Sequence, residues 1–256
     1  MGINIRVLHI VTRLAVRGVP RHVLDLACGL DRQRFAVEVL TGRSELGEGD
    51  LSVEARERGL VLHQVPSLQR AVQPLADCQA YRTIARIVGN GAYDIVHTHI
   101  SKAGILGRLA ARRARVPVVL HTYHGLTDEV GSASLKAGIF RLCERRAATW
   151  SDALVAVSRH VARQWQDMNV GTADQYQVVP NGIDTAYFAA AEAMQLEGDP
   201  QVQRHVERVV VRRERARGGA AVQRLEHGRL DLDVARVVQE VLDGADDAVA
   251  RLEHLA

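Results

Sequence analysis

Seven short runs of mostly apolar residues are spaced along the first 180 positions of the chain. Most of these runs are continuous rather than alternating, as in IRVLHIV, FAVEVLT and YDIVHT. Continuous apolar runs are typical of strands buried on both faces, which a parallel sheet requires because helices cover both of its sides. We therefore predict seven strands, at residues 5–11, 35–41, 60–65, 93–98, 116–122, 152–157 and 176–179.

Segments with helical periodicity lie between these runs. In residues 21–30, apolar side chains recur at the spacing of one helix face, and further helices are predicted at 101–114, 134–149 and 158–168. The alternation of strand and helix predicts an α/β domain built on a single Rossmann-like, doubly wound and mostly parallel sheet of about seven strands. The first and fourth strands are expected to flank its topological switch point.

The pattern changes after Phe188. Residues 189–256 contain no Phe, Trp, Tyr or Lys and no strand-like alternation, and only residues 231–254 carry a helical stripe of apolar residues. Without aromatic residues this segment is not expected to build a core of its own. We predict a domain at 1–188 and a C-terminal tail, helical or disordered, at 189–256. The tail is interpreted as an out-of-frame or fused translation product, with a divergent helical extension as the alternative.

Composition narrows the class of protein. Of the 256 residues 47% are hydrophobic, which is ordinary for a globular domain, and no apolar stretch reaches the roughly 18 residues of a membrane span. The N-terminal run lacks the organisation of a signal peptide, so a cytoplasmic protein is expected. Cys28, Cys78 and Cys143 are far apart and form no CxxC pair, which argues against a disulfide framework. We expect them to be small core residues.

The charge is unevenly distributed. Residues 1–189 carry 23 Lys/Arg and 17 Asp/Glu, whereas residues 190–256 carry 10 and 13. This mild positive excess favours anionic ligands or an anionic membrane surface, and it is too small to indicate nucleic acid. A peripheral contact at the inner face of the plasma membrane is one hypothesis, and a solvated helix face is the alternative. The arginines concerned are Arg108, Arg112, Arg113, Arg115, Arg141, Arg145 and Arg146.

The loop after the first predicted strand is a candidate ligand site, because ligands of doubly wound sheets bind at the carboxyl ends of strands. This loop, TRLAVRGVP, places Gly18 just before the first helix. A glycine there allows the backbone to approach a ligand, and the helix dipole favours a diphosphate. A glycine needed only for the turn is an equal alternative.

Four histidines stand at the ends of two strands that we expect to be neighbours: His97, His99, His121 and His124. His97 and His99 are two positions apart and therefore point to one face of the sheet. For His97 and His121 we favour hydrogen-bonded core histidines, with a zinc site as the alternative. No carboxylate partner stands nearby, so no metal is predicted. The absence of a GxSxG motif argues against a serine hydrolase.

Four segments resemble, in order, the N-terminal domain of the family-4 retaining glycosyltransferases: VRGVPRHVLDLA, DIVHTHISKAGILGRLAARRARVPVVLHTYHG, ERRAATWSDALVAVS and VVPNGIDTAYF. The resemblance covers residues 5–188. It implies one half of a GT-B fold, in which this domain holds the acceptor and a second Rossmann-like domain holds most of the nucleotide sugar. It also implies hexosyl transfer from a UDP- or GDP-sugar to a glycan or lipid-linked acceptor, with retained configuration and no cofactor.

The resemblance assigns roles to individual residues. Gly18 matches the loop beside the donor diphosphate, where Arg17 replaces the first glycine of the family's Gly-Gly pair. His124 matches the histidine that reaches the transferred sugar and supports the developing oxocarbenium. The other matches belong to an acceptor-side loop (His99, Ser101 and Lys102) and to the interdomain hinge (Ser158, Asn181, Gly182 and Asp184).

After residue 188 the sequence departs from the family. Residues 189–256 contain neither the GR turn and Lys-Gly pair of the donor-binding domain nor its two glutamates eight positions apart. We therefore expect little or no transferase activity from this polypeptide alone. A non-catalytic acceptor-binding module, or a subunit that pairs with a separate donor-domain chain, is the alternative. An NAD(P) enzyme is disfavoured because no GxGxxG follows the first strand.

Overall fold

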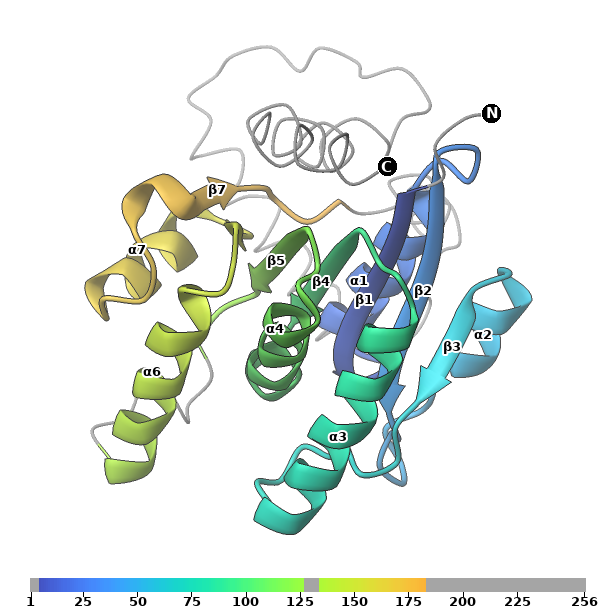
Figure 1. Cartoon of the computed structure of the whole chain (residues 1–256), viewed down its shortest axis with the longest axis horizontal. Helices are drawn as coiled ribbons and strands as arrows, with labels where there is room; N and C mark the ends of the chain where they lie inside the picture. Colours follow the sequence, from blue (N-terminus) through green and yellow to red (C-terminus); the bar gives the residue numbers. More distant parts are fainter. Residues whose placement is uncertain (1–4, 127–133, 183–256) are drawn as a thin grey trace, which may run out of the picture. The chain divides into compact units, whose positions relative to one another are not determined.

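The computed structural model describes residues 5–126 and 134–182, in which helices flank a sheet of seven strands (Figure 1). Asp184 and the predicted tail at 189–256 lie outside the described residues. The strands are β1 (Ile5–Arg13), β2 (Phe35–Gly42), β3 (Val61–Gln64), β4 (Ile95–His99), β5 (Val118–Tyr123), β6 (Ala153–Ala156) and β7 (Tyr176–Val178). The α-helices are α1 (Gly18–Gly29), α2 (Ser52–Glu57), α3 (Pro74–Asn90), α4 (Ser101–Ala114), α6 (Leu135–Ala148) and α7 (Arg159–Asp167).

The sheet has the order β3-β2-β1-β4-β5-β6-β7, and every neighbouring pair is parallel. Strand β1 pairs with β2 on one side and with β4 on the other, so that His9 lies opposite both Val39 and His97. The predicted doubly wound sheet, with the first and fourth strands at the switch point, is confirmed. All seven predicted strands are present, with ends shifted by a few residues.

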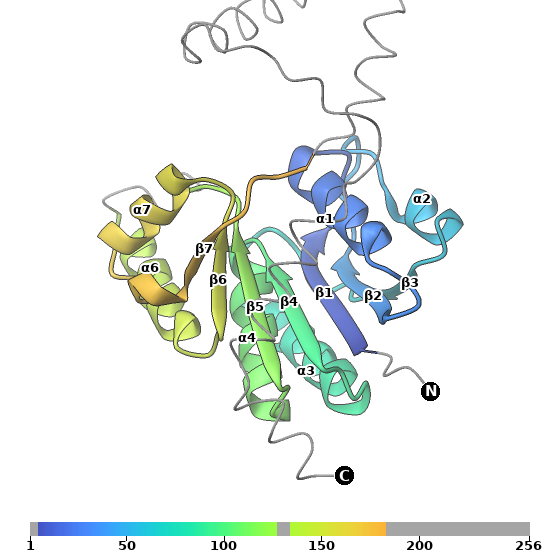
Figure 2. The ribbon, with the colours of Figure 1, turned by 90° about the horizontal axis from the view of Figure 1, so that it is seen from above.

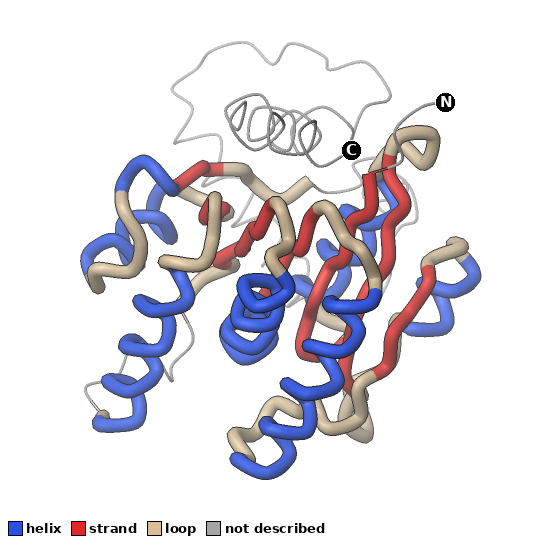
Figure 3. The backbone as a smooth tube through the Cα atoms, viewed as in Figure 1, coloured by secondary structure: helices blue, strands red, loops and turns tan. Residues whose placement is uncertain are grey.

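Helices cover both faces of the sheet, which explains the continuous apolar runs (Figure 2). Helices α1 and α2 lie on one side, and their buried residues share a cluster with Val11 and Val39. On the other side α3 and α4 pack against Leu8 and Ile10. The central strands are therefore buried, whereas Val61 of β3 and Val178 of β7 at the edges are exposed. Figure 3 distinguishes the strands (red) from the helices (blue) that flank them.

Helix α4 lies unusually close to the sheet because it carries two glycines. A Cβ at Gly104 would lie 2.5 Å from His121 Cε1, and one at Gly107 would lie 2.7 Å from Thr98 Cγ2. Neither position can hold a side chain without displacing a neighbour. The helix that follows β4 is thus pressed against the strands that carry the histidines.

Two helices escaped the sequence analysis. The face of α3 buried in the core consists of Ala80, Ile84 and Val88 alone, set among charged and polar residues, so its periodic signal is weak. Helix α2 has only six residues. The expectation that all cysteines are core residues was wrong, because Cys78 and Cys143 are exposed. Both lie on the outer faces of helices, where a small thiol is tolerated.

Candidate functional site

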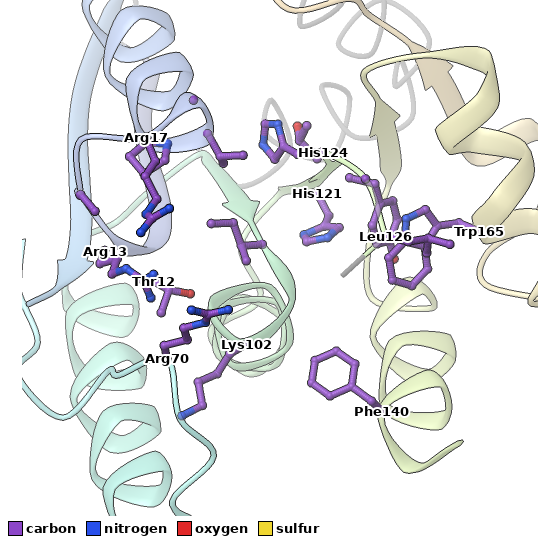
Figure 4. A pocket seen from close by; sticks show the side chains of 18 of the residues that line it. Thr12, Arg13, Arg17, Arg70, Lys102, His121, His124, Leu126, Phe140 and Trp165 are labelled. Carbon is purple, nitrogen blue, oxygen red and sulfur yellow. The ribbon is translucent and has the colours of Figure 1, made fainter. Parts of the chain in front are cut away.

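A cavity of about 650 Å³ opens at the carboxyl ends of β1, β4 and β5 (Figure 4). Thr12 and Arg13 come from β1, Lys102 from the first turn of α4, and His124 from the loop after β5. Carboxyl ends of parallel strands at a switch point are where a doubly wound sheet leaves room for ligands. The cavity therefore lies where the sequence analysis placed the site.

The walls of the cavity differ in character, as Figure 4 shows. One wall is cationic, with Arg13, Arg17, Arg70 and Lys102, whereas the other carries Leu126, Phe140 and Trp165. Such a cavity suits a ligand with an anionic part and an apolar or ring-shaped part.

Some of the cations are held by acidic neighbours. Glu48 accepts from Arg13 at 2.7 Å and from Arg17 at 3.3 Å, which fixes both guanidinium groups beside the first loop. Lys102 is ion-paired with Asp77 of α3. Arg70 forms no ion pair with any described residue, and it is exposed at the rim. Arg70 is therefore the cation most available to a ligand.

Two helices begin at the cavity without side-chain caps. The N-cap residues Arg17 of α1 and Ile100 of α4 make no capping hydrogen bond, and neither helix has an acidic residue in its first turn. The first N–H groups of a helix have no partner within the helix and carry partial positive charge. Both helix ends thus offer donors to an anion, in addition to the charged side chains.

Neither the backbone conformation nor close packing requires a glycine at position 18. Gly18 is not among the residues with positive φ, and a Cβ added to it would meet no atom within 4 Å. The fold itself therefore does not need glycine at this position, which argues against the turn-only interpretation. A side chain at this position would fill the space beside the N-terminus of α1, where a ligand could approach the backbone.

The backbone is strained at the entry to α4. Ile100 has φ 62° and ψ 149°, a region that residues other than glycine rarely occupy. Its carbonyl accepts the amide of Gly104 at 2.7 Å, and its side chain lines the cavity. Strain of this kind persists where surrounding packing enforces it, often at binding sites.

Three histidines form a row from the core to the cavity. His9 Nδ1 lies 3.1 Å from His99 Nε2, and His99 Nδ1 lies 3.3 Å from His124 Nε2. His9 and His99 are fully buried, whereas His124 lines the cavity. Burial, with a smaller contribution from the charge of His22, lowers the pKa of His9 and of His124 to about 3. Burial also places the pKa of His99 well below its usual range, so all three rings are neutral at pH 7.

His97 and His121 sit inside strands and bond to threonines. His97 Nε2 lies 2.7 Å from Thr122 Oγ1, and His121 Nδ1 lies 2.8 Å from Thr98 Oγ1. Both rings are buried, in agreement with the core-histidine interpretation. Ligand nitrogens of His9, His97 and His99 do lie within 4.8 Å of one another. The contact between His9 and His99 uses one nitrogen of each ring and so favours a site without metal. The absence of a metal from this site stays a prediction.

The predicted site residues separate into groups. Arg17, Gly18, Lys102 and His124 line the cavity, and His99 is buried directly behind His124. Ser101 opens helix α4. Ser158 caps α7 by accepting the Val161 amide at 3.2 Å, whereas Asn181 and Gly182 are exposed and do not line the cavity. Sequence reasoning missed Arg13, Arg70, Phe140, Trp165 and His9, which lie on four separate elements and loops and follow no motif.

The hypothesis of a basic surface that includes Arg108 was wrong. Arg108 is fully buried, and its Nη2 donates to Glu144 Oε2 at 2.6 Å. Tyr123 OH donates to the same oxygen at 3.0 Å, and Arg108 Nε donates to the carbonyl of Gly104 at 2.9 Å. This group joins α4, α6 and β5 beneath the cavity. Arg112, Arg113 and Arg115 are exposed, as the hypothesis requires.

Known proteins resemble this chain in sequence over most of its length. UDP-Gal:alpha-D-GlcNAc-diphosphoundecaprenol alpha-1,3-galactosyltransferase of Escherichia coli is 29% identical over an alignment of 194 positions, which covers 73% of this chain and 47% of that protein. The D-inositol 3-phosphate glycosyltransferase of Xylanimonas cellulosilytica is 31% identical over an alignment of 266 positions, gaps included, which covers 93% of this chain and 61% of that protein. The chain spans about half the length of the curated relatives it matches.

Solved structures share the fold. Sucrose-phosphate synthase from Thermosynechococcus elongatus superposes with a TM-score of 0.55 at 15% identity, over 72% of this chain and 49% of that one. Anabaena HepE in complex with UDP and glucose superposes with a TM-score of 0.52 at 17% identity, over 72% and 46%. In sequence, the family described as Glycosyltransferase Family 4 matches residues 16–187, more than half of the chain. With its seven-stranded parallel sheet and the cavity at its switch point, the chain belongs to Glycosyltransferase Family 4, as its N-terminal domain.

Proposed function

We propose that this chain is the acceptor-side half of a retaining glycosyltransferase that moves a hexosyl group from a UDP- or GDP-sugar to a glycan or lipid-linked acceptor. The observation that carries the proposal is the open space at Gly18, which begins α1 without a side-chain cap. Gly18 and His124 line the same cavity. A diphosphate there would accept from backbone amides of α1 and be neutralised by Arg17.

In this proposal His124 is the catalytic residue of this half. Its imidazole donates a hydrogen bond to a hydroxyl of the transferred sugar and so holds the sugar in place while the oxocarbenium develops, without forming a covalent bond. None of the described residues that line the cavity is an aspartate or glutamate, so these residues offer no carboxylate nucleophile. This supports front-face substitution with retained configuration, in which the departing diphosphate and the incoming acceptor lie on one face of the sugar.

The acceptor is proposed to carry phosphate. The names of the relatives mention diphosphoundecaprenol, inositol 3-phosphate and phosphatidyl-myo-inositol. Arg70 at the rim, together with the N-terminus of α4, could bind such a group. The apolar wall formed by Leu126, Phe140 and Trp165 would then receive a sugar ring or the first part of a lipid.

We further propose that α6 rests on an anionic membrane surface. Within residues 5–126 and 134–182 no helix is both long and apolar enough to cross a membrane. Leu135, Ile139 and Leu142 recur along one face of α6 and are 83%, 58% and 65% exposed. The only acidic residue of α6, Glu144, is buried, so the charges that α6 presents outward are cationic. Exposed apolar side chains among cations are typical of interfacial helices.

Nucleotide binding tests the donor site. Calorimetric titration of the purified chain should detect weak binding of UDP or GDP and none of the corresponding nucleoside, because the described half offers mainly diphosphate contacts. Gly18→Val should abolish this binding. Gly89→Val is the matched control, since Gly89 also has open space around its Cβ position but lies on α3, away from the cavity. Equal affinity for the nucleoside would refute the diphosphate site.

Turnover tests the catalytic role. The chain alone is expected to transfer no sugar at a detectable rate, and detectable turnover by the purified chain would contradict this. When a donor-binding domain is joined to it, His124→Ala should lower kcat by about 100-fold or more with little change in unfolding midpoint. An unchanged kcat would refute the role of His124.

Vesicle binding tests the membrane surface. The chain should sediment with vesicles that contain phosphatidylglycerol and not with pure phosphatidylcholine vesicles. Replacing Leu135, Ile139 and Leu142 by Gln should abolish sedimentation. Leu75→Gln on α3, where the side chain is 84% exposed, is the control for loss of a surface leucine.

A further inference from the structure

The row formed by His9, His99 and His124 has unpartnered nitrogens at both ends. The contacts between His9 Nδ1 and His99 Nε2 and between His99 Nδ1 and His124 Nε2 use both nitrogens of the central ring. The terminal atoms, His9 Nε2 and His124 Nδ1, are buried and have no partner among the described residues. The row therefore runs without a branch from the core beneath β1 to a residue of the cavity wall.

Neutral rings arranged in this way cannot choose their tautomers independently. A neutral imidazole has one N–H and one bare nitrogen, so in each contact one ring donates and the other accepts. Only two patterns satisfy both contacts. Either His9 donates to His99 and His99 donates to His124, or both donations run in the opposite direction.

The two patterns differ in what they leave at the ends. In the first, His124 keeps its hydrogen on Nδ1 and His9 Nε2 is a bare acceptor in the core. In the second, His9 Nε2 carries a buried N–H without an acceptor, and His124 Nδ1 is bare. Each pattern thus leaves one N–H without a protein partner, on His124 in the first and on His9 in the second. Orphaned donors are rare in protein interiors, so the pattern that places this N–H on His124, which lines the cavity, is favoured over the one that places it on the fully buried His9.

We propose that His99 and His9 are positioning residues that hold His124, a residue of the cavity wall, as its neutral Nδ1–H tautomer. That this N–H meets the transferred sugar rests on the proposed function, but the tautomer itself does not. The arrangement explains how a ring too buried to protonate can still donate a hydrogen bond to a sugar hydroxyl. It also gives a purpose to histidines placed where aliphatic side chains would pack more simply.

His97 provides a matched control. It is buried beside the row, with its ring centroid 4.2 Å from that of His99. Its Nε2 is engaged by Thr122 Oγ1, so it makes no hydrogen bond within the row. Replacing His97 by Phe disturbs packing around His99 but leaves both contacts of the row in place.

The test is the tautomer of His124 in the full chain labelled with ¹⁵N-histidine, read from long-range ¹H–¹⁵N correlations of the ring at pH 7.5. The His124 signals are assigned by their loss in His124→Gln. We expect a protonated Nδ1 and a bare Nε2 in the unmodified protein. His99→Phe should remove this preference and give signal for Nε2–H, whereas His97→Phe should leave the pattern unchanged.

Several outcomes would overturn the proposal. A bare Nδ1 on His124 in the unmodified protein refutes it without any variant, even if His99→Phe does not fold. Retention of the Nδ1–H tautomer in a folded His99→Phe also refutes it, because the row would then be irrelevant. A metal ion bound between His9 and His99, seen as metal-dependent shifts of both rings, would exclude the shared hydrogen bond. Nucleotide is absent from these measurements, so failure of the donor site leaves the result intact.

Discussion

The two faces of strands β4 and β5 bury polar side chains in different ways. On the face covered by α4 and α6, the charged pair of Arg108 and Glu144 is closed by Tyr123. On the face toward α1, His9, His97 and His99 are buried as neutral rings. Because side chains alternate along a strand, neighbouring residues of β5 serve both groups: Tyr123 bonds Glu144, and Thr122 bonds His97.

The Arg108 group is therefore interpreted as structural, and the histidine row as part of a ligand-binding site. The Arg108 group joins three elements and turns its hydrogen bonds inward, which stabilises the floor of the cavity. Glu144 Oε1 lacks a partner among the described residues, but Glu144 does not line the cavity. The histidine row instead ends at His124, which lines the cavity and whose Nδ1 no described residue bonds. Buried polar groups usually have partners, so an unpartnered atom at a cavity wall indicates a ligand. Loss of the first group should therefore affect stability, and changes in the second should affect ligand binding and pH response.

The largest effect is expected for Arg108→Met. Removal of one partner of a buried ion pair leaves the other charge uncompensated and costs about 3–5 kcal/mol. Urea unfolding should show this loss, and Arg113→Met, an exposed cation of the same helix, should change stability by less than about 0.5 kcal/mol. In the double variant Arg108→Met/Glu144→Leu most of the loss should be recovered. Equal losses in the single and double variants would contradict an ion pair that acts as a unit.

Acid should next weaken the chain through its buried histidines, which include His121 on the face covered by α4. The ordinary pKa of histidine is 6.5, and burial lowers that of His9, His97, His99, His121 and His124 in the folded chain. The unfolded chain therefore binds more protons below pH 6.5, so stability is fully present above this pH and falls as the pH decreases. Each of these histidines contributes up to about 1.4 kcal/mol per pH unit.

Urea unfolding at pH 7.5, 6.5, 5.5 and 5.0 measures this slope. Carboxylates such as Glu38 have an ordinary pKa of 4.5 that is lowered further in the folded chain, so they act mainly below this range. His97→Phe should make the slope shallower by the contribution of one histidine. A free energy of unfolding that is constant from pH 7.5 to 5.0 would refute the buried neutral rings.

A pair of glycines gives a smaller contrast. Gly104→Ala would force a Cβ to within 2.5 Å of His121 Cε1 and should cost about 1–3 kcal/mol. Gly18→Ala meets no atom and should stabilise α1 by up to about 1 kcal/mol. Thermal unfolding distinguishes the two signs. Destabilisation by Gly18→Ala would mean that the fold, rather than a ligand, requires this glycine.

The sequence predicted the sheet well because continuous apolar runs mark strands that are covered on both faces. It placed Gly18 and His124 near the same edge of the sheet because Gly18 follows β1 and His124 follows β5, two parallel strands whose carboxyl ends face the cavity. It misplaced Arg108 because a single arginine on a helix gives no sign of a buried glutamate 36 positions away. His9 escaped for a similar reason, since its role depends on pairing between β1 and β4, two strands that are distant in sequence.

The smallest effect is expected from metal removal. Ligand nitrogens of His9, His97 and His99 lie within 4.8 Å of one another, close enough to suggest zinc. The contact of His9 Nδ1 with His99 Nε2 at 3.1 Å already uses one nitrogen of each ring, and a shared hydrogen there is incompatible with metal on both atoms. Dialysis against a chelator should therefore leave the thermal unfolding midpoint unchanged, whereas a bound structural zinc would make the folded state depend on metal. If the chelator lowered the midpoint and zinc restored it, the histidines would have a structural role like that of the Arg108 ion pair. The contrast between the two faces would then be wrong.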